Sequence, residues 1–157
     1  FFIYQLYLIF KTKVRKQKDI YYKYIVFSVI NFIIALVLVC FYFVLSNDYL
    51  LFISGFIFLL GFLTPIITAH LYKIIPFLVW FHRFSNLVGK QKVPMLADMV
   101  PVKSSDFGFA FYLLGFILSL IAFIFSSDIL FKSAVSFLFV GTSFIVKDVF
   151  YIINFKG

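Results

Sequence analysis

The chain has 157 residues, of which 64% are hydrophobic, 24% aromatic and only 13% charged. A soluble domain carries about 45–50% apolar and about 25% charged residues, so this composition excludes a soluble globular domain. The formal net charge of +8 comes from Lys and Arg residues that surround long apolar segments. That placement argues against nucleic acid as a partner and indicates an integral membrane protein.

The first ten residues, FFIYQLYLIF, have the character of the last part of a membrane span. We therefore expect a single transmembrane domain that is the C-terminal fragment of a larger membrane protein, with the missing N-terminal helices as partners. The basic run KTKVRKQK at positions 11–18 follows. We interpret it as a topology signal, and a site for anionic lipid headgroups or for a partner is the alternative.

Four later segments are long and apolar enough to cross a bilayer, which takes about 20 residues. They are predicted at about 24–45, 49–72, 107–125 and 129–146. The polar turns at 46–48 and 126–128 are so short that the helices on either side must be antiparallel neighbours. The predicted fold class is an all-α, polytopic transmembrane helical bundle with four complete spans and a partial N-terminal one.

The basic residues predict the orientation of this bundle. Of the 14 Lys and Arg residues, all but Lys132 fall on one side of the arrangement. Cytoplasmic loops carry an excess of Lys and Arg, so the basic loops and the C-terminus are expected in the cytoplasm, with the protein in the bacterial inner membrane.

Small and polar residues predict how the helices pack. Asn31, in the first complete span, is expected to form an interhelical hydrogen bond. Small residues let helix backbones approach closely where lipid provides no hydrophobic drive. They recur at seven-residue spacing in the last two spans, at Gly108, Gly115, Ala122, Ala134 and Gly141.

The segment from Gly55 to Pro101 differs from the rest of the chain. Pro65 and Pro76 interrupt an apolar stretch that is longer than one bilayer crossing, and we expect a bend at each proline. The segment is predicted to form one kinked span, followed by an interfacial helix and a cytoplasmic loop at about 73–105.

Both histidines of the chain, His70 and His82, lie in this segment, with Lys73 and Arg83 beside them. Imidazole ligates heme iron, copper or zinc, and basic side chains pair with heme propionates or lipid phosphates. An unbroken helix would place the two histidines about 120° and ~18 Å apart, so they share no metal unless Pro76 folds the segment. These four residues are the candidate cofactor-binding set, and an amphipathic helix among lipid headgroups is the alternative.

No motif in the chain points to catalysis. It contains no Walker-type phosphate loop, zinc-ligand spacing, nucleophile elbow or carboxylate pair, so no catalytic site is predicted. All six acidic residues are interpreted as lying in or beside a loop or at a helix end, which argues against proton or cation coupling. They are Asp19, Asp48, Asp98, Asp106, Asp128 and Asp148.

One stretch of the chain resembles a known family. The motif consists of Gly61-Phe62 and, further along the chain, Tyr72-Lys73-Ile74-Ile75-Pro76. It resembles a region of membrane proteins related to heme-copper oxidase subunit I, a group that includes nitric-oxide-response proteins. The resemblance implies a polytopic helical bundle with heme in a respiratory context. Relatives carry heme-ligating histidines a few residues before a Gly-Trp pair, where this chain has positions 54–56 without a histidine, so no ligand role passes to His70 or His82.

Three functions remain open from the sequence. The first is a heme-associated, oxidase-like bundle, in which His70 binds heme together with groups from missing helices. The second is a transporter of small molecules or ions, for which Thr64-Pro65 would mark a broken helix. The third is a non-catalytic scaffold subunit that holds a membrane complex together through its small-residue faces.

Overall fold

The computed structural model of the protein describes residues 19–155, and this part of the chain contains helices and no strands. The partial span expected in the first ten residues and the basic run at 11–18 lie outside the described residues. The long helices are α2 (Ile20–Leu45), α3 (Asp48–Phe56), α4 (Thr64–Phe84), α5 (Val102–Phe125) and α6 (Asp128–Ile153). The π-helical segment η1 (Ile57–Leu63) joins α3 to α4, and two 3-10 turns, η2 (Ser85–Leu87) and η3 (Leu96–Met99), lie between α4 and α5.

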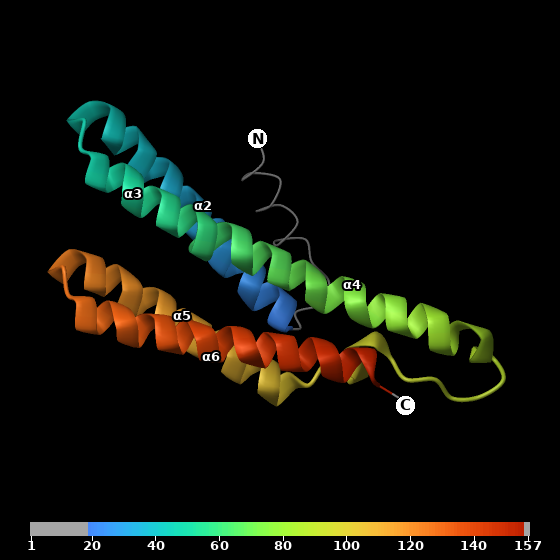
Figure 1. Ribbon diagram of the computed structural model, residues 1–157. Helices are drawn as coiled ribbons and strands as arrows, with labels where there is room; N and C mark the ends of the chain where they lie inside the picture. Colours follow the sequence, from blue (N-terminus) through green and yellow to red (C-terminus); the bar gives the residue numbers. More distant parts are fainter. Residues whose placement is uncertain (1–18, 156–157) are drawn as a thin grey trace.

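The helices form two hairpins that lie side by side (Figure 1). We call α2 with the continuous α3–η1–α4 helix the first hairpin, and α5 with α6 the second hairpin. Both turns lie at the same end of the bundle, and α4 extends past the start of α2 at the other end, which we call the basic end. Four helices, counting 48–87 as one, are long and apolar enough to cross a membrane. The all-α class and the number of candidate spans are confirmed.

The predicted spans are accurate at the hairpin turns and too short at the basic end. There α2 begins at Ile20, α5 begins at Val102 and α6 ends at Ile153. Hydropathy falls where polar residues begin, whereas a helix continues for as long as its backbone N–H and C=O groups pair with each other. The helix predicted after 72 is not a separate one, because α4 runs without interruption through Pro76 to Phe84, and its position at the membrane interface stays a prediction.

The two hairpin turns are built alike, which confirms the antiparallel pairs. Ser46 and Ser126 end α2 and α5 in the left-handed conformation, with φ of 49° and 48°. The next residue caps the following helix: Asn47 accepts a hydrogen bond from the backbone of Tyr49 at 3.0 Å, and Ser127 accepts one from Leu130 at 3.5 Å. Each turn thus satisfies the exposed N–H groups of a new helix within three residues.

The second hairpin is held together by close backbone approach at its glycines. A methyl group on Gly115 would lie 2.6 Å from the backbone nitrogen of Leu138, and one on Gly141 would lie 2.7 Å from that of Tyr112. Gly108 and Ala134 are buried along the same contact. The predicted small-residue packing of the last two spans is confirmed.

The first hairpin uses a different contact. Gly61 lies against Asn31: a methyl group added to Gly61 would be only 2.8 Å from the side chain of Asn31. Asn31 donates its side-chain hydrogen bond to Phe27 of its own helix, at 2.8 Å. The predicted interhelical hydrogen bond is therefore wrong, since an amide four residues after a carbonyl finds its acceptor within the helix.

Pro65 produces the irregular backbone of η1, as the sequence predicts for that position. The N–H of Thr64 bonds to Leu59 rather than to Leu60, and Pro65 has no N–H to donate. The carbonyl of Leu60 is left open by this shift, and the hydroxyl of Tyr112 from α5 donates to it at 2.6 Å. The π-helical segment therefore provides an acceptor by which the second hairpin attaches to the first.

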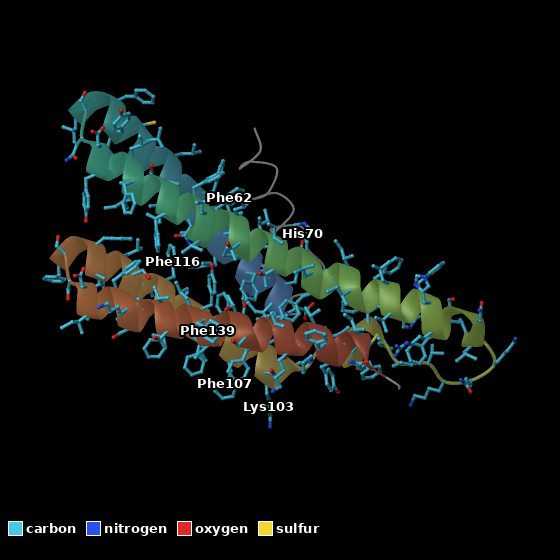
Figure 2. All side chains as sticks on the ribbon, viewed as in Figure 1. Phe62, His70, Lys103, Phe107, Phe116 and Phe139 are labelled. Carbon is cyan, nitrogen blue, oxygen red and sulfur yellow. The ribbon has the colours of Figure 1, made fainter. Side chains whose placement is uncertain are left out.

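Aromatic rings fill the rest of the space between the hairpins. Figure 2 shows Phe116 of α5 between them. Its ring packs edge-on against Phe27 at 5.3 Å between centroids and stacks with Phe56 at 6.1 Å. At the turn end, the hydroxyl of Tyr49 donates to the carbonyl of Phe123. Large rings, single hydrogen bonds and the ion pair of Lys23 with Asp106 join the two hairpins. The ring of Phe116 also fits against Gly61, where an added methyl group would lie 2.9 Å from it.

The glycine contact of the second hairpin is testable with matched substitutions. Gly115→Ala should destabilise the protein by about 1–3 kcal/mol, because the new methyl group meets backbone atoms that cannot rotate away. Gly55→Ala is the control, because no heavy atom lies within 4 Å of its added methyl group. Thermal unfolding of the purified protein in detergent, followed by circular dichroism, measures both variants. Equal midpoints for the two would contradict the proposed close approach.

Candidate functional site

The most unusual residue in the described part of the chain is Asp148, whose relative exposure is 0%. The interpretation of Asp148 as a loop or helix-end residue is wrong. Helix α6 continues to Ile153, well past the predicted end of the last span at 146, so Asp148 lies inside the helix and faces the protein interior. A buried acidic group needs polar partners, because an apolar environment strongly disfavours an unpaired charge or polar atom.

One partner of Asp148 comes from the other hairpin. Tyr72 of α4 donates its hydroxyl to Oδ2 of Asp148 at 2.8 Å. Tyr24 of α2 stacks on Tyr72, with ring centroids 6.1 Å apart. Both tyrosines are buried, and together with Asp148 they form what we call the buried polar cluster. Three helices from both hairpins therefore meet at this cluster.

Packing of α6 explains why Asp148 points inward. Ile145 and Ile152 stand one turn before and one turn after Asp148 on the same helix face. Both are buried in the hydrophobic core that also contains Tyr24 and Tyr72. The apolar residues at this spacing bury the face, and Asp148 is buried with it.

Polar atoms without a partner gather around the cluster. Oδ1 of Asp148, the hydroxyl of Tyr24 and the hydroxyl of Ser104 are buried and have no hydrogen-bond partner among the described residues. Ser104 precedes Gly108 by one helical turn, and Gly108 faces Gly141 and Ile145 of α6, so Ser104 lies at about the level of Asp148. An unmade buried hydrogen bond costs about 1–3 kcal/mol, and native proteins leave few of them. The three atoms therefore mark one polar level of the bundle, beside the hydrogen bond between Tyr72 and Asp148.

A cavity of about 810 Å³ lies next to the cluster, at the basic end. Its walls come from the start of α2, from α4, from the connection that contains η3 and from the start of α5. Tyr72 and Ser105 line the cavity, so the tyrosine whose hydroxyl donates to Asp148 is also part of the cavity wall. Cavities of this size are typical of small-molecule sites.

Two ion pairs and one cation–π contact lie at the charged edge of the cavity, which we call its mouth. Lys23 pairs with Asp106 at 2.6 Å, and Lys73 lies 3.5 Å from Asp19. Lys73 also stands over the ring of Tyr21, with its nitrogen 5.2 Å from the ring centroid. These contacts tie the first turns of α2 and α5 to each other and to α4.

A loop segment closes the side of the cavity. The indole nitrogen of Trp80 donates to the carbonyl of Pro94 at 3.0 Å, which fixes the segment 93–97 against α4. Met95 and Leu96 of that segment line the cavity and are also exposed to the outside. The loop predicted in this region thus forms a wall of the cavity.

The four residues selected from the sequence do not come together. Nδ1 of His70 lies 2.7 Å from the carbonyl of Ile66, one turn earlier, and His82 makes the same contact with Leu78 at 2.9 Å. Figure 2 shows His70 on the side of α4 that faces away from the second hairpin.

The two basic members of that set also lie apart. Arg83 donates to the carbonyl of Phe155 at 2.6 Å near the C-terminus, and only Lys73 of the four lines the cavity. Within residues 19–155, no three His, Cys, Asp or Glu side chains gather in a way that could hold a metal ion.

The residues of the buried polar cluster were missed by the sequence analysis, although one signal for Asp148 is present. Gly141, Ile145, Asp148 and Ile152 follow a 4-3-4 spacing, which is one face of a helix. Extending the last span along that face places Asp148 inside it. The tyrosines carry no comparable signal, because Tyr is also common at membrane interfaces.

Comparison with known proteins leaves the function to be argued from the structure alone. No protein-family model matches the chain, and no curated protein or solved structure matches it. The resemblance to oxidase-like proteins stays a prediction.

The hydrogen bond between Tyr72 and Asp148 can be tested by a double-mutant cycle. Tyr72→Phe should destabilise the protein by about 1–3 kcal/mol, because Asp148 then loses its only hydrogen bond from the described residues. The same change in an Asp148→Leu background should cost clearly less. Tyr151→Phe is the matched control, since this tyrosine is half exposed. Urea or thermal unfolding in detergent measures all four variants, and an equal cost in both backgrounds would contradict the bond.

Proposed function

We propose that the chain is a multi-pass integral membrane protein of the bacterial inner membrane, with the hairpin turns outside and the basic end in the cytoplasm. We further propose that it is a transporter, in which Asp148 binds a cation or a cationic group of the transported solute. Four helices long enough to cross a membrane support the first part. The Lys and Arg residues of the described chain, which lie almost entirely at the basic end, support the orientation.

The single observation that carries the transport proposal is the half-satisfied carboxyl group of Asp148. Acidic residues within membrane helices are costly, so their presence points to ion or substrate pathways. Asp148 is fully buried between two hairpins, and its Oδ1 has no partner among the described residues. Tyr72, which donates to Oδ2 of Asp148, is one of the residues that line the neighbouring cavity.

The construction of the bundle also suits a transporter. Many transporters move one rigid group of helices against another around a site at their interface. The second hairpin is a rigid unit, because backbones meet at Gly115 and Gly141. The contact between hairpins depends on rings and a few hydrogen bonds, and Asp148 lies at that contact.

The other two functions have less support. A scaffold subunit would use its small-residue faces to bind partners, yet Gly108, Gly115 and Gly141 are buried inside the second hairpin. The oxidase-like hypothesis depends on heme-binding groups outside the described residues, because His70 and His82 lie apart and exposed on α4, each with its Nδ1 bonded to its own helix.

Chemical labelling tests whether Asp148 is a site that ligands reach. A hydrophobic carbodiimide, which modifies carboxyl groups in apolar surroundings, should label Asp148 more strongly than the other aspartates, as measured by peptide mass spectrometry. Asp148→Asn should remove that adduct, and Asp128→Asn, at the exposed first turn of α6, should leave it unchanged. Absence of label at Asp148 in the folded wild-type protein would contradict the proposed site.

The orientation is testable by cysteine labelling in intact cells. In a Cys40→Ser background, new cysteines at Asn47 and Ser127 should react with a membrane-impermeant maleimide, since both lie at the hairpin turns. A cysteine at Gln91, in the connection at the basic end, should react only after the cells are opened. The reverse pattern would contradict the orientation.

A further inference from the structure

We infer that the cavity at the basic end binds an organic cation, an ammonium group carried on an apolar or aromatic body, as the substrate of the transporter. This inference names the substrate class and therefore rests on the proposed function. It is argued from the charges around the cavity, from a contact within the protein that already holds an ammonium group, and from the apolar walls.

The charges favour a cation over an anion. Lys23 and Lys73, the lysines that form ion pairs at the mouth, each face an aspartate, at 2.6 Å and 3.5 Å. Behind the wall formed by Tyr72, it is a carboxyl oxygen of Asp148 that lacks a partner among the described residues. Among the described residues that line the cavity, the only basic one is Lys73, so an anion would have to break its ion pair with Asp19, whereas a cation finds an acidic group still open.

Lys73 shows how an ammonium group is held at the mouth. Its nitrogen lies 3.5 Å from Oδ2 of Asp19 and 5.2 Å from the centre of the Tyr21 ring. A carboxylate beside an aromatic face is the arrangement that proteins use to bind ammonium ligands. Its side chain is about half exposed and its ion pair is long, so Lys73 is a weak occupant that a ligand can displace.

The remaining walls suit an apolar body. Phe77, Trp80, Met95 and Val100 also line the cavity, and Phe77 and Met95 are exposed at its outer side. The volume of about 810 Å³ is at the upper part of the range for small-molecule sites, large enough for a ring with a short chain. Apolar walls with a few placed polar groups are typical of ligand pockets.

Tyr72 separates this cavity from Asp148. Tyr72 lines the cavity and its hydroxyl donates to Asp148, so an ammonium group that binds Asp148 from this cavity competes with Tyr72 for it. The two acidic positions, Asp19 at the mouth and Asp148 behind Tyr72, therefore mark an outer and an inner binding position along one path.

Trp80 allows a direct binding measurement, because it is the one tryptophan of the chain and it lines the cavity. The probe is phenethylammonium, and 3-phenylpropionate, an anion with a similar ring and chain, is the matched control. Titration of the purified full-length chain in detergent should give a saturable change of tryptophan emission with the cation and none with the anion.

Two neighbouring substitutions should shift the affinity in opposite directions. Asp19→Asn should weaken phenethylammonium binding roughly fivefold, the scale of one partly exposed ionic contact. Lys73→Gln should tighten it, because the competing ammonium group is removed from Asp19 and Tyr21. A variant that merely disturbs the fold would weaken binding in both cases. Asp128→Asn, at the distant turn, should leave the affinity unchanged.

The outcomes separate this inference from the proposed function. An equal response to the anion, or weaker binding in Lys73→Gln, would overturn the organic-cation inference while carbodiimide labelling of Asp148 still supports an ion site. Loss of that labelling would overturn the transport proposal whatever the tryptophan signal shows.

Discussion

Tyrosine hydroxyl groups that reach across from one hairpin to the other are the contacts on which the rest of the structure depends. Tyr49 donates to the carbonyl of Phe123 near the turns, Tyr112 donates to that of Leu60 in the middle, and Tyr72 donates to Asp148 near the basic end. In apolar surroundings a buried hydroxyl needs a partner, and a tyrosine brings a large apolar ring to the same contact. These three bonds fix the relative position of the hairpins without the backbone approach that glycine allows.

One of these acceptors, the carbonyl of Leu60, is available because the first hairpin is irregular. A regular α-helix already uses its interior carbonyls for its own N–H groups, so a carbonyl freed from that pairing is a stronger attachment point for a neighbour. Pro65 and the π-helical segment before it release the carbonyl of Leu60, and α3–η1–α4 thereby gains an attachment point for Tyr112. The second hairpin has the opposite design, with regular helices locked together at Gly115 and Gly141. One hairpin is thus rigid by packing, and the other is shaped by a backbone interruption.

The sequence predicts the parts of this fold that depend on local rules. Span number, both turns and the glycine contacts follow from hydropathy, from capping residues and from small-residue spacing. The buried polar cluster depends on the distance between helices that are far apart in the chain, and no local rule contains that information. His70 illustrates the limit, because its residue type suggests a ligand, while its position on α4, exposed and facing away from the second hairpin, depends on how the helices pack. Asp148 is the opposite case: its residue type suggests a loop, whereas its spacing from Ile145 and Ile152 on one helix face indicates a buried position.

The two hairpins follow one plan, and the difference between them explains the position of Asp148. Ser54 and Ala134, Gly61 and Gly141, and Thr68 and Asp148 are buried pairs, each at the same distance after its turn serine. Thr68 satisfies its hydroxyl within its own helix, by donating to Thr64 at 2.9 Å. The oxygens of a carboxylate only accept, and the N–H groups of a helix interior are already bonded, so Asp148 finds no donor in its own helix. Its donors must come from outside α6: Tyr72 supplies one, and the second oxygen is the position at which the proposed cation would bind.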